Sequence, residues 1–232
     1  MKILALIPAR GGSKRLPGKN IMPLHGRPLI DWSISFALNS KIFDQIIVSS
    51  DDPNIIQCAV KSGAKTSGLR PKKLSDDNAT SVDVALHELA CAERNSGFFD
   101  YLVLLQPTTP YRKLEILHQA INILEKNPDV PSVVSVSNVL AKPYHMFTML
   151  ENGSIKPLFP DFLKSRTQDL PETFQLNGSL YVVRPNSLKL KRKFYFNDSR
   201  AVLCSDVQEN IDIDTLSDFK NAERLLEKYK DI

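Results

Sequence analysis

Short apolar runs alternate with segments of helical periodicity along most of this chain, and this alternation limits the possible fold more than any other feature. The apolar runs predict strands over Ile3–Ala9, Gln45–Ser50, Tyr101–Gln106 and Ser132–Ser137. Apolar residues three or four positions apart predict helices over Pro28–Asn39, Pro53–Ser62, Ser81–Asn95 and Lys113–Lys126. Because parallel strands need a crossover connection, the alternation indicates an α/β fold with a mostly parallel sheet flanked by helices.

Local signals support two of the helix starts. Asp52 precedes Pro53, and Thr80 with Asp83 has the pattern of a capping box. Later in the chain the sequence predicts strands Ser179–Arg184 and Ala201–Ser205, an extended segment Asn210–Ile213 and a helix Thr215–Lys230. One face of that helix would consist of Leu216, Phe219, Ala222, Leu226 and Tyr229.

A stretch with four prolines interrupts the alternation at 138–174. A length of 232 residues suits one large domain, so we expect residues 1–232 to form a single domain in which 138–174 is an insertion of hairpins and loops. An excursion of this length usually serves as a substrate lid or a subunit contact. We therefore expect a homodimer.

Composition excludes several classes of protein. No apolar run approaches the ~18 residues of a membrane-spanning helix, and Ile3–Ala9 contains a proline and lacks an export cleavage site. The three cysteines and four histidines are scattered, without the spacing of disulfide or zinc sites, which favours a cytoplasmic protein. The basic run Lys189, Lys191, Arg192 and Lys193 is interpreted as a solvated loop, so we expect neither a nucleic-acid nor a membrane partner.

The first thirty residues carry an unusual charge. They hold six basic residues, no acidic residue and four of the nine glycines, whereas the other 202 residues hold 24 basic and 26 acidic residues. The whole surplus of positive charge therefore lies beside the first predicted strand. A basic, glycine-rich segment next to a strand favours a phosphate ligand.

The loop that follows this strand matches neither common phosphate motif. Five residues rather than four separate Gly12 from Gly18, asparagine follows Lys19, and G-x-G-x-x-G is absent. Its glycines would still let the backbone approach a polyphosphate, which Arg10 and Lys14 would help to neutralise. A solvated surface loop is the alternative, but no acidic residue lies nearby in the sequence.

Two carboxylates mark a candidate metal site. Asp212 and Asp214 are two residues apart in a predicted extended segment, so both side chains would project to one side. Paired carboxylates suit Mg²⁺, which also keeps waters and substrate phosphate oxygens as ligands. The alternative is structural, with Asp214 as the N-cap of the closing helix and Asp212 as a solvated edge residue.

The loop and five later motifs resemble a known family in their order along 1–225. The motifs are Arg70-Pro71, Leu74 to Ser81, Leu104 to Pro110, Asn177 to Tyr181 and Ile211 to Thr215. Together they resemble the acylneuraminate cytidylyltransferases (CMP-sialic acid synthetases), including the legionaminic and pseudaminic acid cytidylyltransferases. The resemblance implies a Rossmann-like fold of the nucleotide-diphospho-sugar transferase type. It also implies a Mg²⁺-dependent transferase that joins CTP to a nonulosonic acid, giving a CMP-sugar and pyrophosphate.

The resemblance also assigns residues to roles. The residues expected to bind the nucleotide are Ala9, Arg10, Gly11, Gly12, Ser13, Lys14, Lys19, Asn20, Arg70 and Ser81. Those expected to contact the sugar are Gln106, Lys142, His145, Arg166, Asn177 and Tyr181. Arg10, Lys19, Asp212 and Asp214 would be catalytic, the two aspartates as Mg²⁺ ligands. A guanidinium such as that of Arg166 suits the carboxylate of a nonulosonic acid.

This chain departs from the family pattern near the expected sugar site. Gln175 stands where many members have a basic residue, and either Lys142 or His145 would be the basic contact of the insertion. The acceptor therefore stays open among sialic, legionaminic and pseudaminic acids. The alternatives are a cytidylyltransferase for the eight-carbon acid Kdo (a CMP-Kdo synthetase), another sugar nucleotidyltransferase, or an inert nucleotide-binding scaffold.

Overall fold

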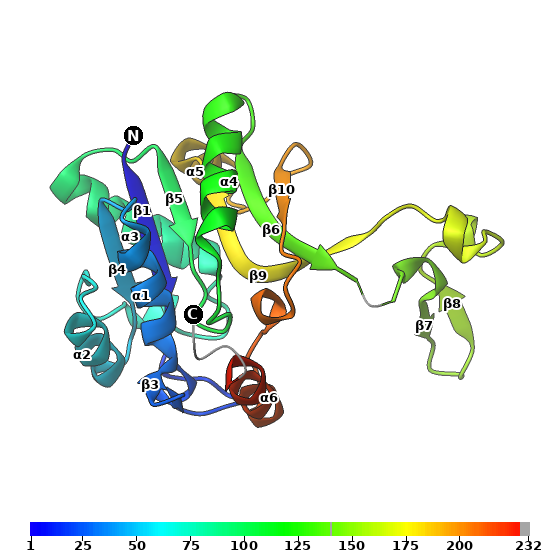
Figure 1. The fold of residues 1–232 in the computed structure, drawn as a ribbon, viewed down its shortest axis with the longest axis horizontal. Coiled ribbons are helices and arrows are strands. Elements are labelled where there is room, and N and C mark those ends of the chain that lie inside the picture. The colour runs from blue at the N-terminus through cyan, green and yellow to red at the C-terminus, as the bar shows by residue number, and fades with distance from the viewer. Residues whose placement is uncertain (140, 228–232) are drawn as a thin grey trace.

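A six-stranded sheet forms the centre of the protein, in the order β10-β6-β9-β5-β1-β4 (Figure 1). The computed structural model describes residues 1–139 and 141–227. The strands are β1 (Ile3–Pro8), β4 (Gln45–Ser49), β5 (Tyr101–Leu104), β6 (Ser132–Asn138), β9 (Phe174–Val183) and β10 (Arg200–Leu203). β1 lies parallel to β4 and β5, β10 lies parallel to β6, and β9 runs antiparallel between β5 and β6. The mostly parallel sheet is confirmed, with one reversed strand.

Helices cover both faces of this sheet. They are α1 (Leu29–Ser40), α2 (Pro53–Lys61), α3 (Ser81–Ser96), α4 (Leu114–Lys126), α5 (Pro185–Lys191) and α6 (Leu216–Glu227). Apolar residues of α1, α2 and α4 pack on one face of the sheet, and those of α3 and α5 pack on the other. Short 3-10 turns lie at Lys19–Ile21, Lys72–Leu74, Pro143–His145, Pro160–Phe162, Thr167–Asp169 and Val207–Asn210. No helix in the described part of the chain is long and apolar enough to cross a membrane.

The helix starts that carry capping signals are confirmed. Asp52 accepts a hydrogen bond from the Asn54 amide, and Thr80 and Asp83 form a reciprocal capping box. The helix predicted from Pro28 begins at Leu29, because Pro28 pairs in a small hairpin of β2 (Pro23–Leu24) and β3 (Arg27–Pro28).

The closing helix differs from its prediction in three ways. It begins at Leu216, and its cap is Thr215, which exchanges hydrogen bonds with Asp218. The alternative in which Asp214 caps this helix is therefore wrong. Leu216 is exposed in the first turn, while Phe219, Ala222 and Leu226 are buried as predicted. Residues 228–230 and Tyr229 lie outside the described residues.

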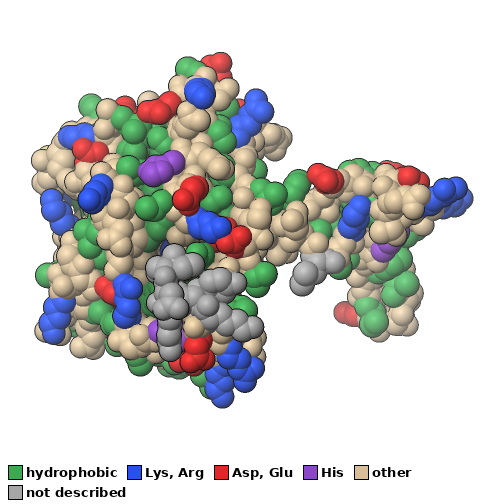
Figure 2. Space-filling view, viewed as in Figure 1, with side chains coloured by type: hydrophobic (Ala, Val, Ile, Leu, Met, Phe, Trp, Pro, Cys, Tyr) green, Lys and Arg blue, Asp and Glu red, His purple; other side chains and the backbone are tan. Residues whose placement is uncertain are grey.

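Residues 141–173, here called the arm, project from the body between β6 and β9 (Figure 1). A hairpin of β7 (Phe147–Met149) and β8 (Ile155–Pro157) forms part of the arm. Tyr144 is its small core, with ring centroids 5.5 Å from Phe159 and 4.6 Å from Phe162. Hydrophobic side chains also gather on its surface (Figure 2). The exposed ones are Met146, Phe147, Met149, Leu150, Ile155, Leu158, Phe159 and Leu163.

Candidate active site

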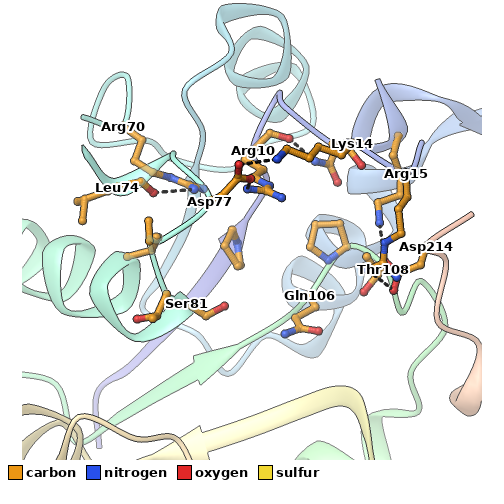
Figure 3. Close-up of a pocket in the computed structure, with 18 of the residues that line it drawn as sticks. Arg10, Lys14, Arg15, Arg70, Leu74, Asp77, Ser81, Gln106, Thr108 and Asp214 are labelled. Atoms are coloured by element: carbon orange, nitrogen blue, oxygen red, sulfur yellow. Dashed lines mark hydrogen bonds and ion pairs between the residues drawn. The ribbon is translucent and has the colours of Figure 1, made fainter. Parts of the chain in front are cut away.

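A cleft of about 570 Å³, here called the basic cleft, opens where β1 and β5 end (Figure 3). Ligands bind at this end of the strands in open α/β sheets. Five basic side chains line it, together with four aspartates. The charged lining residues are Arg10, Lys14, Arg15, Lys19, Arg70, Asp76, Asp77, Asp212 and Asp214. The polar ones include Ser13, Asn20, Thr80, Ser81, Gln106 and Thr108.

The loop after β1 is held close to the turn that follows β4. The amide of Gly11 donates to the Asp51 carboxylate over 2.9 Å, and a Cβ at Gly11 would lie 2.8 Å from the Cβ of Asp52. Only glycine fits this approach. Ala9 is buried and Gly12 has open space around it, so these three residues shape the backbone of the loop and lie outside the lining of the basic cleft.

Acidic residues distant in sequence neutralise the loop. Arg10 and Lys14 lie 3.3 and 2.5 Å from the two carboxylate oxygens of Asp77. The hydrogen bond from Lys14 is the main reason that the pKa of Asp77 falls below its usual value. Arg15 lies 2.8 Å from Asp214 (Figure 3). The sequence showed no nearby acidic residue because Asp77 and Asp214 are distant in sequence and approach the loop only in the folded protein.

Buried polar contacts hold the far end of the loop. Lys19 is 7% exposed, and its ammonium donates to the Ile213 carbonyl over 2.7 Å and to Asp214 over 3.1 Å. Asn20 donates its side-chain amide to the carbonyl of Arg10 over 3.0 Å. Lys19 therefore fixes the loop against the 211–214 segment, and Asn20 joins the two ends of the loop.

Asp212 and Asp214 both line the basic cleft, although their segment forms no strand. Ile211 and Ile213 alternate with them and are buried, which turns both carboxylates to the same side. Loss of water raises the pKa of Asp212, and the charge of Asp214 raises it further. Two carboxylates whose charges repel fit a divalent cation that takes its other ligands from phosphate and water. The described residues hold no group of three or more His, Cys, Asp or Glu side chains suited to a metal.

Arg70 forms a wall of the basic cleft through internal contacts. It is 7% exposed, and its guanidinium donates to the Ser49 hydroxyl over 3.0 Å and to the Leu74 carbonyl over 3.4 Å. The same Ser49 hydroxyl donates to the buried Glu88 over 2.6 Å. Burial lowers the pKa of Arg70. Arg70 thus ties the 71–74 turn to the end of β4.

A second cleft, of about 920 Å³ and here called the aromatic cleft, adjoins the first at Ser81 and Gln106. Its other lining residues are Val82, Leu104, Tyr181, Lys191, Arg192, Lys193, Phe194, Tyr195, Phe196, Asn197 and Asp198. The rings of Tyr181 and Phe194 have centroids 5.8 Å apart. Burial raises the pKa of Tyr181, and the charges of Tyr195 and Asp212 raise it further.

The basic run at 189–193 is exposed to solvent as expected, although Lys189 and Lys191 lie on α5 rather than in a loop. Lys191, Arg192 and Lys193 also line the aromatic cleft. Lys189 of that run does not line this cleft and forms an ion pair with Glu93 at 2.8 Å. Charge spacing along a chain does not reveal which surface those charges will face.

A buried arginine that sequence analysis missed supports Gln106. Arg112 donates to the carbonyls of Gln106 and Ser179, each over 2.6 Å, and to the Thr109 hydroxyl over 2.8 Å. Burial lowers its pKa to about 9. Gly178, with φ of 73°, packs beside Gln106, where a Cβ would lie 3.1 Å from the side-chain oxygen. The sequence gave no sign that Arg112 would be buried, because it stands in a segment that is typical of an exposed loop.

Four residues expected near the sugar lie elsewhere in this chain. Asn177 is 8% exposed, accepts from Ser135 over 2.6 Å and donates to Asn210 over 3.1 Å, so its amide is used inside the body. Lys142 donates to two carbonyls within the arm, and His145 and Arg166 are exposed on the arm. None of these four lines either cleft. The other two, Gln106 and Tyr181, line the aromatic cleft, and Ser81, expected to bind the nucleotide, lines both clefts.

Comparisons with known proteins agree with this architecture. A family model described as cytidylyltransferase matches residues 4–231. The chain is 38% identical to a CMP-N,N'-diacetyllegionaminic acid synthase of Legionella pneumophila, over 98% of this chain and 97% of that protein. It is 36% identical to a pseudaminic acid cytidylyltransferase of Campylobacter jejuni, over 97% and 96% of the two chains. The fold matches a CTP-bound CMP:2-keto-3-deoxy-manno-octonic acid synthetase at a TM-score of 0.76 and 18% identity, over 99% and 100% of the chains. The chain thus belongs to the cytidylyltransferase family of nucleotidyltransferases.

Proposed function

We propose that this enzyme transfers CMP from CTP to the anomeric hydroxyl of a nonulosonic acid. The observation that carries the proposal is the junction of the two clefts at Ser81 and Gln106. The acceptor oxygen would attack the α-phosphorus, the bond from that phosphorus to the bridging oxygen of the β-phosphate would break, and pyrophosphate would leave. The acceptor's hydroxyl proton would be lost in the same reaction.

The basic cleft supplies the charge that a triphosphate needs. Arg10, Lys14, Arg15 and Lys19 together place four positive charges on one loop. Positioning and neutralisation are the protein's main contributions to phosphoryl transfer, because the chemistry involves little covalent help from side chains. Ser13, Asn20 and Ser81 add polar groups to the same lining. Arg70, being fixed by internal contacts, would shape the nucleotide side of the cleft.

Mg²⁺ would be held by Asp212 and Asp214. A bound Mg²⁺ would polarise the α-phosphate and stabilise the charge that develops on its oxygens. Lys19 keeps Asp214 in place, and the buried Ile211 and Ile213 keep both carboxylates turned into the basic cleft. The position of both carboxylates on the lining of the basic cleft supports this role.

The aromatic cleft would hold the acceptor sugar. Gln106 and Tyr181 offer it an amide and a hydroxyl, and Gln106 lies where the two clefts meet. Aromatic walls suit the apolar faces of a sugar ring. The relatives named for legionaminic and pseudaminic acids support a nine-carbon acid over Kdo, since the likeness to the Kdo enzyme extends only to the fold. Relatives that are enzymes also argue against an inert scaffold.

A homodimer would bury the arm. Eight large hydrophobic side chains lie exposed on it, an arrangement that marks an interaction surface. Lys142, His145 and Arg166 lie on the arm and line neither cleft of their own chain. Their expected contact with the sugar therefore requires a second copy of the chain. Light scattering should give a dimer at working concentration, and a monomer would contradict the proposal. The free cysteines support a reducing, cytoplasmic location.

The test is a pyrophosphate-release assay with all four nucleoside triphosphates, with and without Mg²⁺. The acceptors are sialic, legionaminic, pseudaminic and Kdo acids, and products are identified by mass. We expect release with CTP, Mg²⁺ and a nine-carbon acid. Release with Kdo as the only accepted acid would instead show that the enzyme is a CMP-Kdo synthetase. CTP binding without release for any acceptor would refute the proposed function.

A further inference from the structure

The rim of the aromatic cleft carries positive charge that the proposed reaction does not yet use. Lys191, Arg192 and Lys193 line this rim, against a single lining carboxylate, that of Asp198. The triphosphate has its own cations in the basic cleft. The excess charge therefore points to an anionic group on the molecule that occupies the aromatic cleft.

The three cations differ in what they already contact. Arg192 forms an ion pair with Asp83 of α3. The ammonium of Lys191 lies 5.0 Å from the centre of the Phe196 ring. Across the described residues, Lys193 makes no ion pair, hydrogen bond or ring contact. Of the three, Lys193 is the cation whose charge is left for a ligand.

The backbone on both sides of Lys193 is fixed. Arg192 ends α5 with φ of 51° and donates its amide to the Leu188 carbonyl over 2.9 Å, while its guanidinium is anchored on α3. Phe194 is 7% exposed and packs its ring against Tyr181. Lys193 is exposed and lines the cleft, and these neighbours hold its backbone in place.

We propose that Lys193 binds the carboxylate of the acceptor and so selects sugar acids over neutral sugars from within the same subunit. This proposal rests on the proposed function, because it takes the aromatic cleft as the acceptor site. A charge-assisted hydrogen bond is stronger than one between neutral groups. A neutral sugar leaves the ammonium without its partner, which is the physical basis of the selection.

The first experiment measures initial rates of pyrophosphate release against acceptor concentration at saturating Mg²⁺ and CTP. We compare the wild type with Lys193→Met, Lys193→Arg and the matched control Lys189→Met. Lys189 belongs to the same basic run but pairs with Glu93 outside the cleft, so its loss tests general electrostatic attraction. We expect Lys193→Met to raise the acceptor KM about 10-fold, since a hydrogen bond to a charged group is lost. Its kcat and its KM for CTP should stay near wild type, Lys193→Arg should restore most of the loss, and Lys189→Met should match wild type.

A second experiment asks whether the carboxylate itself is what Lys193 contacts. The wild type should use the methyl ester of the acceptor acid about 10-fold less well than the acid, judged by kcat/KM. Lys193→Met should show little of this difference, which a purely structural role would not produce. Circular dichroism and thermal unfolding check that each variant is folded.

The outcomes separate the two proposals. A Lys193→Met enzyme with wild-type kinetics, or one that still discriminates against the ester, overturns the role of Lys193 and leaves the proposed function standing. Loss of ester discrimination in Arg166→Met alone would assign the carboxylate to the arm instead. A wild-type enzyme that turns over no acid overturns the proposed function, and the role of Lys193 fails with it.

Discussion

The ammonium of Lys19 lies 3.1 Å from the carboxylate of Asp214, which joins the loop after β1 to the segment before α6. Lys19 is buried, so this contact is weakly screened by solvent. We expect Lys19→Met to lower kcat at least ~10²-fold, because it removes a positive charge from the cleft and releases Asp214. Steady-state pyrophosphate release measures this loss.

The same variant should also lower the free energy of unfolding. Lys19→Met removes hydrogen bonds to Ile213 and Asp214, and a hydrogen bond to a charged group contributes roughly 1.5–3 kcal/mol. Urea unfolding measures the change. Lys220→Met, on the exposed side of α6, is the control and should alter neither kcat nor stability. A Lys19→Met enzyme with wild-type kcat would remove Lys19 from the catalytic set.

The second prediction concerns the metal. Removing Mg²⁺ with a chelator should abolish turnover, and Asp212→Ala or Asp214→Ala should lower kcat at least ~10²-fold. Asp212→Asn keeps an oxygen ligand and loses the charge, so it should need more Mg²⁺ for half-maximal rate. Titration of rate against Mg²⁺ concentration distinguishes these cases. Full activity in the Asp212→Ala, Asp214→Ala double variant would exclude the two carboxylates as the metal site.

Sequence reasoning succeeded where the determining interactions are local. Periodicity placed the core strands and long helices, and the capping pattern of Thr80 and Asp83 located the start of α3. The loop after β1 could be identified because its charge and glycines stand in one short segment. The gathering of Arg10, Lys19 and Asp214 in one cleft follows from the position of that loop at the strand ends.

The remainder depends on contacts between distant residues. A buried apolar run reads the same for either strand direction, so the antiparallel β9 was not foreseen. Lys14 and Asp77 are 63 positions apart, so no local sequence pattern predicts that they pair. Asn177 stands in a motif beside the cleft, yet its amide turns inward to Ser135 and Asn210. Motifs thus locate a site but do not settle which side chains face it.

The third prediction follows from the carboxylate that faces the loop cations. Asp77 pairs with Arg10 and Lys14, which the triphosphate would also contact, so the carboxylate competes with the nucleotide. Asp77→Asn should tighten CTP binding by up to about fivefold at low salt, and less at high salt because exposed pairs are screened. Isothermal titration calorimetry measures the affinity, with the remote Asp129→Asn as control. Weaker binding in Asp77→Asn would instead place Asp77 among the groups that hold the nucleotide.

The last prediction concerns stability and pH. The Thr80 hydroxyl and amide donate to Asp83 over 2.6 and 3.1 Å, and these bonds hold the pKa of Asp83 below its usual value. A carboxyl with a lowered pKa in the folded state stabilises the protein above its unfolded pKa, near ~4, and loses that contribution as the pH falls. Asp83→Asn should therefore unfold about 0.5–1 kcal/mol more easily at pH 7, with the difference shrinking below pH ~4. Urea unfolding of both proteins across this range measures the difference, and a gap that does not change with pH would show that the charge of Asp83 contributes nothing to the start of α3.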